Sequence, residues 1–228
     1  MLTDWWTIFL DMVYPPKCPG CKTVVCEQGG WCASCLGKIA AVRSINMVEH
    51  HLVSLDSCWA VCEYTGSLKG LIHDMKFRRK QGYARYLQWL LRKQIKGEMF
   101  NSIDYVIPVP LHEKRLQERG YNQTEAIFKD YFKGTLQDKF IAQENPWRPE
   151  LLLRTRQTVP QWELKSVARK ANITGAFVAP YPNIVKNKKI LLVDDIFTTG
   201  MTLDECAKVL KNAGASSVHA LVVASGAR

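Results

Sequence analysis

Short apolar runs alternate along this chain with segments in which apolar residues recur every three or four positions. The runs predict buried strands, and the recurring pattern predicts amphipathic helices. Strands are predicted at 58–64, 103–110, 151–154, 175–179, 188–195 and 217–225, and helices at 67–77, 83–95, 122–132 and 203–212. Because strands alternate with helices, the predicted fold class is α/β, a doubly wound, mainly parallel sheet with helices on both faces.

The first part of the chain differs from the rest and is predicted to form a small domain of its own. Positions 1–13 have apolar residues at helical spacing, two aspartates and no basic start, which predicts an amphipathic helix and excludes a signal peptide. This helix could pack against a neighbouring domain or contact a membrane surface. Residues 39–53 are interpreted as a linker or short helix, so the predicted domains are 1–53 and 54–228. We expect no transmembrane segment and a cytoplasmic location.

Two Cys-x-x-Cys pairs lie close together in this first domain, and ten residues separate them. Each pair places two thiolates on a tight turn, so both pairs can face one tetrahedral ion in a ribbon. Cys26 lies between the pairs and could replace one ligand, and buried or redox-active thiols are the alternative to a metal site. The predicted ligands of a structural zinc ion are Cys18, Cys21, Cys32 and Cys35.

Charge adds a second prediction. The chain carries 31 lysines and arginines against 21 acidic residues, a formal net charge of +10, which favours a polyanionic partner or phosphorylated ligands. The steepest bias lies at 76–96, where no acidic residue occurs, and either a solvated helix face or a track for a nucleic-acid backbone explains it. The predicted track for single-stranded DNA consists of Lys76, Arg78, Arg79, Lys80 and Arg85, with base stacking on Tyr83, Trp147 or Trp162.

Candidate chemistry concentrates at ILLVDDIFTTGMT, residues 190–202, where an apolar run leads into two aspartates and a threonine-rich loop. Ligands bind at the carboxyl ends of parallel strands, and a loop entering a helix there offers backbone N–H groups to a phosphate. Gly200 permits close approach, while Asp194 and Asp195 can accept hydrogen bonds from sugar hydroxyls. The segment is therefore predicted to hold a ribose 5-phosphate, with hydroxyl donors from Thr198, Thr199 and Thr202.

This segment resembles the signature of the type I phosphoribosyltransferases. The resemblance implies that Asp194 and Asp195 hold the ribose hydroxyls of phosphoribosyl pyrophosphate, bound with Mg²⁺, and act at the catalytic centre. It also implies a 5-phosphate cradle made by Thr198, Thr199, Gly200, Met201 and Thr202. Two basic segments occupy the positions of the pyrophosphate loop and the flexible lid of such enzymes, with solvated loops as the alternative. Their candidate residues are Lys114, Arg115 and Arg119 in the loop, and Arg154, Arg156, Lys165 and Arg169 in the lid.

Taken together, the cysteine ribbon, RGYNQ at 119–123, RTRQT at 154–158, RKANITGAF at 169–177 and VDDIFTTGMT at 193–202 resemble the ComF family of competence proteins. This resemblance implies a protein that handles incoming single-stranded DNA during bacterial natural transformation, in some bacteria alongside a helicase-like partner. A binding module and an active transferase with an unidentified acceptor both remain open. A third hypothesis is that the ribbon chiefly docks a protein partner.

Overall fold

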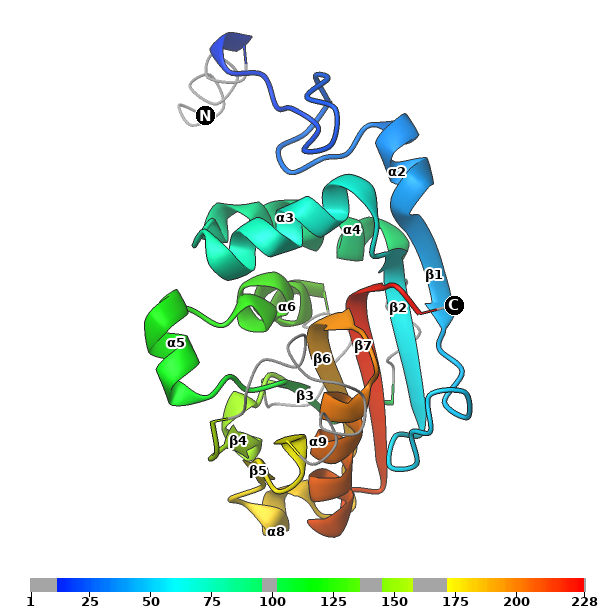
Figure 1. Cartoon of the computed structure of the whole chain (residues 1–228), viewed down its shortest axis with the longest axis vertical. Coiled ribbons are helices and arrows are strands. Elements are labelled where there is room, and N and C mark those ends of the chain that lie inside the picture. Colours follow the sequence, from blue (N-terminus) through cyan, green and yellow to red (C-terminus); the bar gives the residue numbers. More distant parts are fainter. Residues whose placement is uncertain (1–11, 96–101, 136–144, 158–171, 228) are drawn as a thin grey trace.

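The computed structural model of the protein describes residues 12–95, 102–135, 145–157 and 172–227. Within these residues, five strands form one sheet in the order β1, β2, β7, β6, β3 (Figure 1). The pairs β2 with β7, β7 with β6 and β6 with β3 are parallel, and β1 is antiparallel to β2. The strands are β1 (Ala40–Ser44), β2 (Ser57–Glu63), β3 (Tyr105–Pro108), β6 (Lys189–Phe197) and β7 (Ser217–Ser225).

Helices cover both faces of this sheet, which confirms the predicted fold class. In β6, Leu191 and Val193 pack in one apolar cluster with residues of α3, α4 and α6, whereas Ile190 and Leu192 pack in a second cluster with residues of α9. Figure 1 shows α3, α4 and α6 grouped together, apart from α9. The helices are α2 (Ala33–Ile39), α3 (Gly66–Phe77), α4 (Ala84–Gln94), α5 (Glu113–Arg119), α6 (Gln123–Thr135), α8 (Pro182–Val185) and α9 (Met201–Asn212), with 3-10 turns at Gln81–Tyr83 and Pro149–Leu151.

The interpretation of 39–53 as linker or short helix is wrong for its first part. Strand β1 pairs with β2, with Ala40 opposite Cys62 and Ser44 opposite Trp59. Its residues are only partly buried, because β1 is an edge strand that borders a single neighbour. The boundary predicted near Ser54 therefore falls between two hydrogen-bonded strands of one sheet.

Two predicted strands do not join the main sheet. Strand β4 (Leu153–Arg154) and strand β5 (Phe177–Val178) instead pair with each other as a small antiparallel sheet. Strand β6 is also longer than predicted, because its pairing with β7 continues to Phe197, opposite Ser225. Both aspartates at 194 and 195 therefore belong to the strand itself, which fixes their backbone.

The cysteine-containing segment is anchored to the outer side of α4. The indole Nε1 of Trp31 donates a hydrogen bond to the carbonyl oxygen of Tyr86 (3.1 Å), and Trp31 is buried. In the other direction, Trp89 Nε1 donates to Glu27 Oε1 (2.7 Å). Gly29 lies so close to this helix that a Cβ there would meet the carbonyl oxygen of Arg85 at 2.9 Å. The cysteine-containing segment is thus packed directly on α4.

Parts of three predictions lie outside the described residues. The amphipathic helix predicted at 1–13 is described only at Met12 and Val13, whose side chains are exposed. The lid residues Lys165 and Arg169 and the aromatic residue Trp162 are not among the described residues. No helix in the described part of the chain has both the length and the apolar character that a bilayer crossing needs.

Candidate ribose-phosphate pocket and zinc site

The carboxyl end of β6 and the start of α9 form a tight loop that requires a glycine. Gly200 has φ +74° and precedes the first residue of α9. A Cβ at this position would lie 2.5 Å from Leu52 Cδ1 and 2.7 Å from Phe197 Cε2. The left-handed conformation and these two contacts disfavour any side chain at position 200. The sharp turn at this glycine places the start of α9 beside the aspartates.

A pocket of about 280 Å³ opens at this loop. Both aspartates line it, together with cationic side chains that come from three different segments of the chain, α3, α5 and β4. The sequence predictions brought together in the pocket are Asp194, Asp195, Thr198, Gly200, Thr202, Arg115, Arg119 and Arg154. Because parallel strands end at one edge of the sheet, residues distant in sequence converge here.

The two aspartates have different partners. Asp195 is buried, and its Oδ1 lies 2.8 Å from Lys76 Nζ. Asp194 Oδ1 accepts hydrogen bonds from Thr124 Oγ1 (3.2 Å) and from the backbone N–H of Asp195 (2.8 Å). Burial and the neighbouring charge of Asp195 raise the pKa of Asp194 to about 7, against the opposing effect of Lys76. One carboxyl of the pair is therefore poised to exchange a proton near neutral pH.

The segment after α5 builds the part of the pocket wall that adjoins Asp194. Asn122 Oδ1 accepts a hydrogen bond from the backbone N–H of Thr124 (3.0 Å), and so caps the start of α6. Gln123 is buried, and its Oε1 accepts a hydrogen bond from Arg119 (2.8 Å). Its Nε2 is buried and has no hydrogen-bond partner among the described residues. The segment therefore orients one pocket arginine and leaves an amide donor in the pocket wall.

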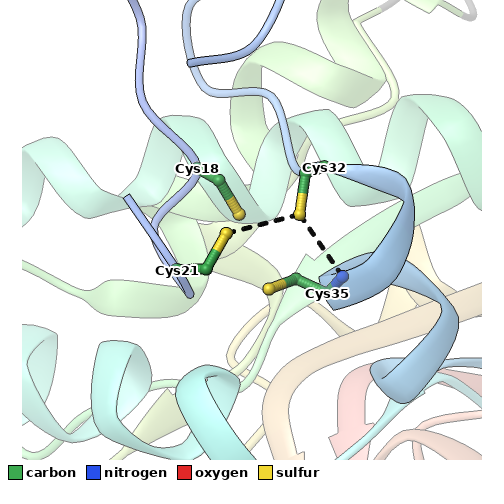
Figure 2. A group of neighbouring side chains, drawn as sticks. All are labelled: Cys18, Cys21, Cys32 and Cys35. Carbon is green, nitrogen blue, oxygen red and sulfur yellow. Dashed lines mark hydrogen bonds between the residues drawn. The ribbon is translucent and has the colours of Figure 1, made fainter. Parts of the chain in front are cut away.

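The four cysteines of the two Cys-x-x-Cys pairs come together as predicted. Figure 2 shows their sulfur atoms gathered around one point, and all four sulfurs lie within 4.8 Å of one another. Cys26 is exposed and is not part of the group. The predicted ligands that the structure brings together are Cys18, Cys21, Cys32 and Cys35.

The electrostatics of this cluster fit a divalent cation. Hydrogen bonding by Thr23 lowers the pKa of Cys21 to about 6. Burial and hydrogen bonds to the other cysteines raise the pKa of Cys35 to about 12. Neighbouring thiolates disfavour one another unless a cation lies between them, and zinc accepts four thiolates in a closed structural site.

Two family models match the chain. A phosphoribosyl transferase domain matches residues 156–228, and a double zinc ribbon domain matches residues 9–45. With the four-cysteine cluster, the second match identifies a structural zinc site. The first match covers β5, β6 and β7 and the loop that lines the pocket.

Curated relatives extend the match over more of the chain. The DNA utilization protein YhgH of Shigella flexneri is 32% identical over 163 residues, which is 70% of this chain and 67% of the relative. Competence protein F of Haemophilus influenzae is 24% identical over 90% of this chain and 82% of the relative. Competence protein ComFC of Streptococcus pneumoniae is 25% identical over 70% of this chain and 64% of the relative.

The chain belongs to the ComF family. The resemblance drawn from the sequence is thereby confirmed, as is the combination of a phosphoribosyltransferase-like domain with a zinc ribbon.

Some predicted residues of this ComF-family chain do not line the pocket. They are Lys114, Arg156, Thr199 and Met201. Arg156 instead donates hydrogen bonds to the carbonyl oxygens of Asn172 (2.9 Å) and Thr174 (2.7 Å). Its partner in the proposed lid, Arg154, is largely buried, and this burial lowers its pKa. The two arginines therefore have different positions although one residue separates them.

The basic segment of the ComF-family chain divides in a similar way. Lys76 lines the pocket, whereas Arg78 and Lys80 form ion pairs with Asp74 (3.4 and 2.9 Å). Arg79 donates to the carbonyl oxygen of Glu118, and the Arg85 guanidinium lies over the Tyr86 ring. Four of the five basic residues thus lie together around the end of α3 and the start of α4.

Of the aromatic residues predicted to stack on bases, Trp147 is wrong, because its side chain is only 4% exposed. It is buried in the apolar cluster beneath α6 and cannot present a ring face to a nucleotide. Tyr83 is partly exposed and contacts Tyr86 edge to face, with 6.0 Å between ring centroids. The ammonium of Lys80 also lies 5.1 Å from the centroid of the Tyr83 ring.

Three polar residues of the pocket were not predicted from the sequence to lie there. Gln123 and Thr124 lie just after Gly120, which ends α5 with φ +80°, and the only sequence signal is the turn that this glycine marks between two helices. The third, Lys76, lies four and eight residues after the buried Ile72 and Leu68, on the buried side of α3. That register distinguishes Lys76 from the exposed cations after it.

Proposed function

We propose that the pocket of this ComF-family chain binds phosphoribosyl pyrophosphate or a related ribose phosphate, and that the protein handles single-stranded DNA in natural transformation. In this proposal Asp194 and Asp195 accept hydrogen bonds from the ribose hydroxyls. The loop that ends at Gly200 and the first turn of α9, which contains Thr202, hold the 5-phosphate. Arg115 and Arg119 neutralise a pyrophosphate group, and Mg²⁺ accompanies that group when it is present.

One observation carries the ligand proposal. A carboxylate pair, the start of a long helix and three arginines line a single pocket of about 280 Å³. A ribose phosphate has one end that donates hydrogen bonds and one end that is anionic, and the pocket offers matching groups at both. The buried Nε2 of Gln123 adds a donor without a partner among the described residues.

The DNA-handling part rests on the relatives and on charge. The relatives are named competence proteins and DNA utilization proteins. The basic cluster at the end of α3 and the start of α4 offers cations to a phosphate backbone, with Tyr83 beside them for stacking. A helicase-like competence protein is the proposed protein partner, by analogy with the family.

The test is a calorimetric titration of the full-length protein with phosphoribosyl pyrophosphate and Mg²⁺. We expect saturable binding to one site, weakened about tenfold or more in Asp195→Asn, because a carboxylate acceptor for the sugar is lost. A second titration uses labelled single-stranded DNA with and without the sugar phosphate. No binding of any ribose phosphate to the unmodified protein would refute the pocket proposal and leave the DNA proposal standing.

An active transferase is the second candidate function. The raised pKa of Asp194 favours it, since a carboxyl that titrates near pH 7 beside an anion-binding pocket can accept a proton from an attacking group. A panel of bases and amines incubated with phosphoribosyl pyrophosphate and Mg²⁺ tests it by pyrophosphate release. Release that Asp194→Asn abolishes supports transfer, and binding without release to any acceptor supports a binding module.

A further inference from the structure

Lys76 is the cation that α3 contributes to the pocket, whereas the pocket arginines belong to α5 and β4. It lies in the last turn of α3, and its side chain is 22% exposed. Its Nζ lies 2.8 Å from Asp195 Oδ1, and it lines the pocket with both aspartates. The other described lysines of the same basic run, Lys80 and Lys93, with 42% and 53% exposed side chains, do not line the pocket.

The end of α3 is held in place from several sides. Leu68, Ile72 and Met75 are buried on the inner side of this helix. The hydroxyl of Tyr121 donates a hydrogen bond to the carbonyl oxygen of Met75 (2.8 Å), one residue before the lysine. The guanidinium of Arg119 lies 6.0 Å from the ring centroid of Phe77, the residue that follows the lysine. Lys76 is therefore fixed where its side chain meets Asp195.

Two adjacent carboxylates in a partly buried pocket need a positive charge. A divalent cation supplies it in many sugar-phosphate sites, and a lysine can supply it without metal. The ammonium of Lys76 is already at hydrogen-bonding distance from Asp195 Oδ1, and it carries further donors that could reach a ligand oxygen. The remaining pocket cations are Arg115, Arg119 and Arg154.

We propose that Lys76 is the resident counter-ion of Asp195 and a ligand-binding residue of the pocket, so that a ribose 5-phosphate binds without a divalent cation. The inference rests on the proposed ribose-phosphate function and deepens it. Mg²⁺ then serves only a pyrophosphate group. In this proposal Lys76 is a residue of the sugar site and not of the DNA track that the sequence predicted.

The experiment is calorimetry of the full-length protein with ribose 5-phosphate, which has no pyrophosphate to recruit a metal. Buffers are freed of divalent cations with a chelating resin instead of a soluble chelator, so that the zinc site stays loaded. We expect the affinity of the unmodified protein to change by less than about twofold when Mg²⁺ is added. In Lys76→Met it should fall about tenfold or more without Mg²⁺ and recover in part with Mg²⁺.

Matched variants separate charge from structure. Lys69→Met removes an exposed lysine from the same helix, outside the pocket, and should bind as the unmodified protein does. Lys76→Arg keeps the positive charge and should bind within about threefold, also without Mg²⁺. Recovery of Lys76→Met by Mg²⁺ is a response that a merely misfolded variant would not give.

The outcomes are distinguishable. If the unmodified protein binds ribose 5-phosphate only when Mg²⁺ is present, the proposal for Lys76 is overturned and the ribose-phosphate function stands. Equal binding by Lys76→Met and the unmodified protein overturns it as well. If the unmodified protein binds neither ribose 5-phosphate nor phosphoribosyl pyrophosphate under any condition, the proposed function itself fails, and this inference fails with it.

Discussion

Leu52, in the segment between β1 and β2, lies directly against Gly200 in the loop that starts α9. A Cβ on Gly200 would come within 2.5 Å of Leu52 Cδ1. The same segment is tied to α9 by the backbone N–H of Ser54, which donates to Asp204 Oδ1 (2.7 Å). A stretch interpreted from the sequence as linker therefore supports the candidate phosphate loop from behind.

We expect Gly200→Ala to destabilise the protein by about 1–3 kcal/mol, because it adds left-handed strain to a clash with Leu52 and Phe197. Binding of phosphoribosyl pyrophosphate should fall in parallel. Chemical denaturation and calorimetry measure the two effects. Gly70→Ala is the control, since this position lies inside α3 and a Cβ there would meet no neighbouring atom within 4 Å, and it should stabilise by about 0.5–1 kcal/mol.

The pKa of Asp194, raised to about 7 by burial and by Asp195, predicts a pH dependence of stability. The folded-state pKa of Asp194 exceeds the unfolded value of about 4. As the pH rises, the carboxyl therefore loses its proton in the unfolded chain before it does so in the folded protein. The contribution of the protonated carboxyl is fully present below about pH 4 and is lost as the pH rises toward 7. Lys76 opposes the shift and limits it.

Asp194→Asn cannot ionise and should therefore lack this loss. Between about pH 5 and pH 7 we expect the unmodified protein to lose on the order of 1–2 kcal/mol relative to Asp194→Asn. Urea denaturation at each pH, with the zinc content checked, gives the difference. Parallel pH profiles of the two proteins would contradict the raised pKa.

The zinc site predicts a contrast between two cysteines of the same small domain. Cys32→Ser should lose the zinc and loosen the ribbon from α4, changing the fluorescence of Trp31 and Trp89 at that contact. Cys26→Ser should keep a full complement of zinc, since Cys26 is exposed and outside the cluster. Metal analysis and fluorescence check both results. Zinc loss in the second variant alone would mean that Cys26 is a ligand.

The basic cluster predicts a localised effect on DNA binding. Reversing its charges in Arg78→Glu, Arg79→Glu and Lys80→Glu should abolish binding of labelled single-stranded DNA at low salt. The matched control reverses the charges of Lys186, Lys188 and Lys189, which lie at the start of β6. The control changes the net charge by the same amount, but at the end of β6 that is farther from the pocket. Fluorescence anisotropy measures both. Equal losses of DNA affinity in the two variants would mean that net charge alone determines binding, which would contradict a localised basic cluster.

The fold and the loop of the pocket could be predicted because their signals are local. An apolar run, two aspartates and a Thr/Gly loop lie within thirteen consecutive residues, 190–202, and strand and loop form from neighbours in sequence. The cysteine cluster was equally accessible, since its spacing alone specifies a four-thiolate cage.

Other features depend on distant partners. Strand β1 is only five residues long and none of them is fully buried, and it is a strand because β2 offers it an edge to pair with. Lys76 belongs to a basic run in the sequence, and only the packing of α3 turns it toward Asp195, which lies in β6. Arg154 and Arg156 separate because β4 is short and pairs with β5 alone. Such placements follow from tertiary packing, which short-range patterns do not encode.

The central claim is that the pocket between β6 and α9 holds a ribose phosphate. The most direct measurement is a crystal structure of the protein with phosphoribosyl pyrophosphate and Mg²⁺. Our account predicts density for the sugar hydroxyls at Asp194 and Asp195 and for the 5-phosphate at the loop ending at Gly200 and the first turn of α9. A pocket that stays empty at saturating ligand, or a ligand bound elsewhere with the aspartates untouched, would contradict it.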